Sequence, residues 1–92
     1  MINERIDVAE TCAKYGIPDH MWGAVERYLF DRIEPGSFLT HVLCNDLLGS
    51  FGAADHHNQA AMRSWASMIY NEFPRGSHGS EKAVSEWLRG DR

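Results

Sequence analysis

The loop Pro74–Ser80 is the segment of this sequence whose residue types could bind an anion. Its glycines let backbone amides point at one object, and Ser77 and Ser80 add hydroxyl donors. Ser80 also precedes an amphipathic stretch, so we predict that it caps a helix whose N-terminus carries partial positive charge. A plain turn between two helices explains the same composition, and no P-loop spacing is present. The candidate ligand-binding residues are Arg75, Ser77, His78, Ser80 and Lys82.

Two carboxylates, Asp46 and Glu72, each follow an asparagine inside an otherwise apolar helical stretch. A carboxylate in such a stretch must be exposed, paired or functional. One hypothesis makes them the acid–base groups of a small nucleotide hydrolase, which would require a raised carboxyl pKa. The sequence favours the other, in which side-chain hydrogen bonds to loop amides hold helix ends together, and no catalytic residue is assigned. The residues predicted to be structural are Ser37, Asn45, Asp46, Asn71 and Glu72.

Histidines and cysteines raise the question of a metal site. The five histidines are His20, His41, His56, His57 and His78. None follows another at helical spacing, although His41 and Cys44 are three residues apart and could hold zinc with ligands from elsewhere. Cys44 lies in an apolar run, where a small buried thiol is the simpler interpretation. We therefore predict no metal and no cofactor, and a reduced protein in which pairing of Cys12 with Cys44 stays open.

The elements that must position these residues are helices. Apolar residues recur at helical spacing nearly throughout, which predicts an all-α fold, a compact bundle of about four to five short helices in one domain spanning residues 1–92. The predicted helices run from about Asn3 to Tyr15, from Pro18 to Ile33, from Ser37 to about Leu47, from His56 to Phe73, and from Ser80 to Gly90. Gly49 and Gly52 leave the end of the third helix open, and residues 48–51 form either a break or a short extra turn.

Caps and inward stripes follow from the same pattern. Pro35 and Gly36 turn the chain, and the hydroxyl of Ser37 is expected to cap the third helix; Asp55 is expected to cap the fourth. The inward stripes include Ile6, Val8, Ala9 and Ala13, then Met21, Trp22, Val25, Leu29 and Ile33, then Phe38, Leu39, Val42, Leu43 and Leu47. The three tryptophans, Trp22, Trp65 and Trp87, are predicted to be core residues.

Composition excludes two classes of partner. The net charge is −4, from nine basic and 13 acidic residues, so the chain lacks the basic face that unspecific nucleic-acid binding requires. No apolar run approaches the roughly 20 residues that cross a bilayer, and the N-terminus does not read as a signal peptide. We expect a cytoplasmic protein that does not bind membranes.

Several motifs occur together along most of the chain. They are Ile17-Pro18 with Met21, the run Pro35-Gly36-Ser37-Phe38-Leu39, the run Val42-Leu43-x-Asn45-Asp46-Leu47, the run Tyr70-Asn71-Glu72-x-Pro74, and Gly79-Ser80. In these motifs the chain resembles a family of short uncharacterised proteins encoded by tailed bacteriophages and prophages. The resemblance covers about residues 17–88 and implies an accessory protein made in the cytoplasm of an infected host bacterium. The loop departs from the family pattern, because similar sequences often carry Cys-Trp before the Gly-Ser pair.

A small accessory protein of this kind is expected to bind rather than to catalyse. The favoured hypothesis is a protein that counteracts a host defence system, by binding a host protein or by sequestering a nucleotide-type immune signal near Arg75, Ser77 and Ser80. The alternatives are a replication or assembly regulator or scaffold that acts by protein contact, and the small hydrolase. Apolar residues on several short helices also predict a homo-oligomer.

Overall fold

The computed structural model describes residues 7–90, and within that range the protein is entirely helical, with no strand. This confirms the predicted all-α class. The elements are α1 (Val8–Tyr15), the 3₁₀ turn η1 (Asp19–Met21), α2 (Trp22–Asp31), α3 (Ser37–Leu43), α4 (Leu47–Ala53), α5 (His56–Ala60), α6 (Met62–Glu72) and α7 (Glu81–Arg89). None of the helices in this range is long and apolar enough to cross a membrane.

The number of helices exceeds the prediction because the third expected helix is shorter and an additional helix follows it, and because the fourth is divided. The third ends at Cys44; Asn45 takes a left-handed conformation with φ of 66°, and Asp46 then caps α4. Asparagine is one of the few residues that adopts this region readily. The predicted helix His56–Phe73 breaks at Ala61 into α5 and α6. The residues 7–90 therefore form seven α-helices rather than four to five.

Most predicted helix ends are confirmed, but the capping role of Ser37 is wrong. Asp55 accepts a hydrogen bond from the amide of Asn58, and the Ser80 hydroxyl accepts one from the amide of Ala83. By contrast, α3 begins at Ser37 itself, and its N-cap is Gly36, which has no side chain to offer. The start of α3 is held instead by Thr40, whose hydroxyl donates to the Pro35 carbonyl at 3.2 Å.

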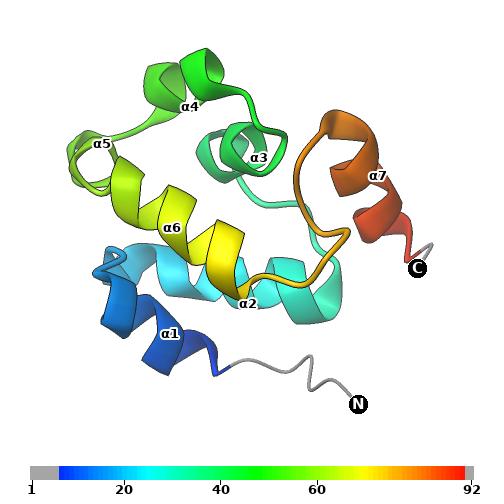
Figure 1. Cartoon of the computed structure of the whole chain (residues 1–92), viewed down its shortest axis with the longest axis horizontal. Helices are drawn as coiled ribbons and strands as arrows, with labels where there is room; N and C mark the ends of the chain where they lie inside the picture. Colours follow the sequence, from blue (N-terminus) through cyan, green and yellow to red (C-terminus); the bar gives the residue numbers. More distant parts are fainter. Residues whose placement is uncertain (1–6, 91–92) are drawn as a thin grey trace.

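The helix α6 lies at the centre of the molecule (Figure 1). It packs between α1 on one side and α3 on the other, with α5 at its N-terminal end, while α7 packs against α3. The helix α4 packs mainly on α3, which leaves part of its surface without a neighbouring helix. The largest fully buried side chains are Trp65, Tyr28, Leu39, Leu43, Met68, Val25, Cys12 and Ser77.

The tryptophans contribute to the core as predicted, and each indole nitrogen has a partner. Trp65 is fully buried and donates to Asn58 Oδ1 at 2.9 Å, while Trp87 donates to the Tyr28 carbonyl at 3.0 Å. Trp22 is half-buried and donates to the Ile17 carbonyl. Buried indole N–H groups left unpaired would be costly, so these bonds also fix the relative positions of the helices.

Several residues predicted to face inward do not. Val8 and Cys12 are the buried residues of α1, whereas Ala9 and Ala13 are exposed, and Ile6 lies outside the described residues. Ile33 and Leu47 are 48% and 64% exposed. Both errors follow from helix ends: α2 stops at Asp31, and Leu47 begins a new helix whose orientation differs from that of α3.

Candidate functional site

A groove lies between α4 and α6, with α3 and the loop 74–80 at its base and end. Its volume is about 510 Å³, and most of its lining is apolar. We call it the α4–α6 groove; its lining residues are Val42, Leu43, Asn45, Asp46, Leu47, Ser50, Met62, Ala66, Ser67, Ile69, Tyr70, Asn71, His78 and Gly79. The volume falls within the range of sites that bind other molecules.

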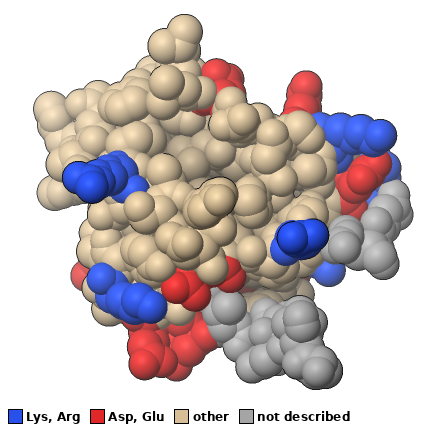
Figure 2. All heavy atoms as spheres, viewed as in Figure 1, with Lys and Arg blue, Asp and Glu red and all other residues tan. Residues whose placement is uncertain are grey.

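Large apolar side chains stand exposed on the two helices that border this groove. On α4, Leu47, Leu48 and Phe51 are 64%, 83% and 44% exposed, and Tyr70 on α6 is 83% exposed. Leu47 and Tyr70 line the groove directly. Figure 2 shows that the broad side of the molecule over α3, α4 and α6 is mostly uncharged, with the charged side chains mainly around its edge. Large exposed apolar side chains next to an apolar groove are typical of an interaction site.

The polar groups of the groove are neutral except for Asp46. Asp46 Oδ1 accepts from the amide of Gly49 at 2.9 Å, and Oδ2 lies 2.9 Å from His41 Nδ1. The Gly49 amide and His41 hold the pKa of the Asp46 carboxyl below its ordinary value, so it is charged at neutral pH. Burial lowers the pKa of His78, so its imidazole is neutral there.

The same arrangement of an aspartate and a histidine occurs before α4 and after it. Asp46, at its start, caps α4 and contacts His41; Asp55, just after its end, caps α5 and contacts His20 Nε2 at 3.0 Å. In each case one carboxylate oxygen binds a helix amide and the other faces the imidazole. These contacts set the position of one wall of the groove.

The carboxylates of Asp46 and Asp55 make the free energy of unfolding depend on pH in the acid range. Their pKa values are lowered in the folded state, chiefly by the amide each one caps, so their contribution is complete above about pH 5 and is lost as the pH falls below about 3.9. We expect D46N/D55N, which keeps an amide oxygen for each cap, to lose less stability than wild type when the pH is lowered from about 5 to about 2.

Urea unfolding followed by circular dichroism at each pH measures this difference. Asp31→Asn is the control, because the side chain of Asp31 makes no hydrogen bond or ion pair with other residues in the range 7–90. Equal acid sensitivity of D46N/D55N, Asp31→Asn and wild type would contradict the assigned role of the two caps.

The predicted ligand loop uses many of its polar groups internally. Ser77 is fully buried; its amide and hydroxyl both donate to the Pro74 carbonyl, and its own carbonyl accepts from Tyr28 at 2.6 Å. The amide of Gly79 donates to the Leu43 carbonyl at 2.7 Å. Ser77 therefore presents no group to an external ligand, and the loop is a brace between α2, α3 and α6.

The other residues of the predicted ligand site are separated by this arrangement. The Ser80 hydroxyl accepts from the Ala83 amide as an N-cap, and Arg75 and Lys82 are exposed. His78 is the one residue of that predicted site that lines the α4–α6 groove. The loop thus brings a neutral imidazole, rather than a cluster of cations and free amides, to the groove.

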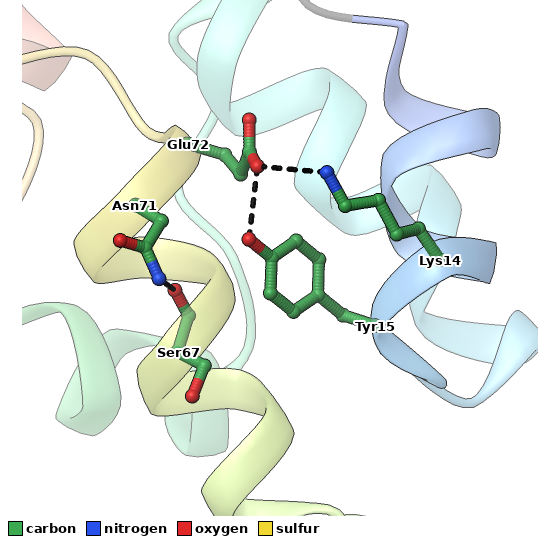
Figure 3. Close-up of polar contacts among 5 residues, drawn as sticks. All are labelled: Lys14, Tyr15, Ser67, Asn71 and Glu72. Atoms are coloured by element: carbon green, nitrogen blue, oxygen red, sulfur yellow. Dashed lines mark hydrogen bonds and ion pairs between the residues drawn. The ribbon is translucent and has the colours of Figure 1, made fainter.

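Glu72 and Asn71 contact different parts of the molecule (Figure 3). Glu72 Oε2 accepts from the Tyr15 hydroxyl at 2.9 Å and lies 3.4 Å from Lys14 Nζ, so it joins the end of α6 to the end of α1. The hydrogen bond to Glu72 raises the pKa of Tyr15. Asn71 donates to the Ser67 carbonyl on its own helix. Glu72 is therefore engaged against α1, whereas Asp46 is engaged at the start of α4.

The cysteines and histidines do not assemble a metal site in the part of the chain that the structure describes. No group of three or more His, Cys, Asp or Glu side chains there could hold a metal ion, and His41 contacts Asp46. Cys12 and Cys44 are both free thiols. Burial raises the pKa of Cys12 to about 11 and also raises that of Cys44, which makes both thiols poor nucleophiles at neutral pH.

Sequence reasoning missed the groove and the exposed face of α4. The signal was present, since Asn45-Asp46 is a typical helix stop and N-cap, and a helix restarted there need not keep its leucines inside. Comparison with protein-family models, curated proteins and solved structures gives no match to this chain. The inference of function therefore starts from the geometry of the groove.

Proposed function

We propose that this chain is a non-enzymatic binding protein that holds an apolar, helical segment of a partner protein on α4 and α6. The observation that carries this proposal is an apolar groove lined by the exposed side chains of Leu47 and Tyr70, with Leu48 and Phe51 also exposed on α4. An amphipathic helix binds such a groove through apolar side chains at helical spacing. Burial of exposed leucine and aromatic side chains supplies the affinity.

Charge at the ends of the groove defines the partner further. Asp46 begins α4, and Arg63, next to the groove residue Met62, stands exposed near the start of α6. A partner helix with a basic residue near one end and an acidic residue near the other would complement both. The amide side chains of Asn45 and Asn71 add hydrogen-bonding groups at the edge of the groove.

The phage-like motifs of the sequence supply the setting of the proposal. The protein acts in the cytoplasm of an infected bacterium, and its partner is a host protein of a defence system. A replication or assembly regulator would use the same surface by the same kind of contact. Sequestration of a nucleotide-type signal has less support, because no Lys or Arg is among the groove residues. In the loop 74–80, Ser77 and the Gly79 amide already make hydrogen bonds within the protein.

We expect Leu48→Glu to raise the dissociation constant for the captured host protein at least about tenfold, which corresponds to about 1.4 kcal/mol. The carboxylate would have to be buried in an apolar interface, while the free protein keeps its fold because Leu48 is 83% exposed. Capture from a bacterial lysate identifies the partner, and calorimetric titration with the purified partner measures the constant.

Ile33→Glu is the matched control, because Ile33 is also a large exposed apolar residue but follows α2 and lies on neither α4 nor α6. It should bind like wild type. Equal loss of binding in both variants, or none in either, would reject the α4–α6 surface as the binding site. A saturable rise in melting temperature with cyclic nucleotides would instead favour the sequestration hypothesis.

A further inference from the structure

The α4–α6 surface consists of the α4–α6 groove and the exposed side chains of Leu47, Leu48, Phe51 and Tyr70. We infer that, when no partner protein is bound, this surface pairs with the same surface of a second copy of this chain, with the two α4 helices antiparallel. The inference rests on the proposed function, because it names the resting occupant of the same surface. It follows from three properties of that surface: its exposed apolar side chains, its extent, and the distribution of charge along it.

The apolar side chains give the surface a reason to be covered. Leu48 and Tyr70 are each 83% exposed, and Leu47 and Phe51 add to the same surface. In an isologous dimer one patch contacts its own copy, so a patch must be self-complementary. A groove with prominent apolar side chains beside it supplies both the projections and the hollow that such a contact needs.

The broad side that carries this surface is large enough for such an interface. The molecule measures 35 × 27 × 19 Å, and α4 and α6 lie along the broad side seen in Figure 1. A stable interface of standard size needs about 800 Å² from each partner, which is comparable with one broad side of this molecule. The helix α7 lies at the edge of this view and need not move.

Charge selects the orientation. The start of α4 lies beside α3, whereas α6 starts beside α5 (Figure 1). Asp46, which caps α4, and Met62, which begins α6, both line the groove. Asp46 is charged, and Arg63 is exposed and makes no ion pair within residues 7–90. A two-fold axis across the groove sets Arg63 opposite the partner subunit's Asp46 twice, and makes the two α4 helices antiparallel. An axis along the groove would set like charges against each other.

Sedimentation velocity of the purified chain, from about 5 to about 500 µM, tests the inference. We expect a concentration-dependent dimer for wild type and for Ile33→Glu, and a monomer for Leu48→Glu. The orientation is tested by Arg63→Glu against Arg27→Glu, which makes the same change of charge on the exposed side of α2. At low salt, Arg63→Glu should raise the dissociation constant of the dimer about tenfold more than Arg27→Glu does. At high salt, the difference between the two variants should be smaller.

Each result decides the matter. A wild-type monomer at the highest concentration overturns the inference, as does dimerisation of Leu48→Glu equal to that of wild type. Equal effects of Arg63→Glu and Arg27→Glu overturn the antiparallel arrangement. Circular dichroism confirms that each variant is folded. If the wild type is a monomer but still captures a host protein through Leu48, the proposed function stands and the dimer is rejected. If the wild type is a dimer but captures nothing, the dimer stands and the proposed function is rejected.

Discussion

Trp65→Ala is expected to destabilise the protein by about 3–5 kcal/mol, a large part of the roughly 5–15 kcal/mol that a small domain has. Trp65 is fully buried at the centre of α6, and its ring meets that of Phe38 edge to face with centroids 5.6 Å apart. Removing the indole leaves a cavity between α3 and α6. It also removes the donor to Asn58, which is only 2% exposed and would keep a buried carbonyl without its partner.

Urea unfolding at neutral pH measures this loss, and Tyr70→Ala is the matched control. Tyr70 lies on the same helix and also carries a large aromatic ring, but it is 83% exposed. We expect Tyr70→Ala to change stability by no more than about 0.5 kcal/mol, since no cavity forms. Similar losses of stability for the two variants would contradict the placement of Trp65 on the buried face of α6 and of Tyr70 on its exposed face.

The prediction that Trp65 belongs to the core came from helical spacing alone, and it succeeded because one face of α6 is buried along its whole length. The predictions that Asp55 and Ser80 are N-caps are confirmed for a related reason. An N-cap depends on bonds to amides a few residues away, which are visible in a short stretch of sequence. Fold class and most helix ends could therefore be predicted.

Features that depend on distant segments could not be predicted. The burial of Ser77 depends on Tyr28, which is 49 residues away and donates to the Ser77 carbonyl. The Asn45-Asp46 pair is a local signal for a helix break, but it does not fix one, because asparagine tolerates the left-handed conformation without requiring it. The α4–α6 groove depends on both, because the break starts α4 as a separate helix in a new direction and the loop 74–80 forms the end of the groove.

The exposed apolar surface of α4, on which the proposed binding depends, is therefore a consequence of a restarted helix. Had Asn45 continued α3, Leu47 would follow the stripe of Leu39 and Leu43, which are buried. The cap at Asp46 instead begins α4 with its two leucines exposed. Whatever disturbs the Asp46 corner should thus disturb the surface, and one glycine in α4 offers a direct way to do so.

Gly49→Ala is expected to destabilise the protein by about 2 kcal/mol, within the range for overpacking a closely packed site. A Cβ atom at Gly49 would lie 2.4 Å from Asp46 Oδ2 and 2.5 Å from His41 Nδ1. The carboxylate has no room to yield without losing its hydrogen bond from the Gly49 amide or its contact with His41. The start of α4 must then shift, and with it Leu47 and Leu48 on the binding surface.

Gly52→Ala, on the same helix, is the control with the opposite sign. A Cβ atom there meets nothing within 4 Å, so the substitution should stabilise α4 by about 0.5–1 kcal/mol through its helix propensity. Thermal unfolding compares the two variants, and titration with the captured partner reports on the surface. Binding should weaken in Gly49→Ala and be unchanged in Gly52→Ala. If both alanines stabilised the protein, the close contact of Gly49 with Asp46 and His41 would be refuted, and with it the account of how this corner positions α4.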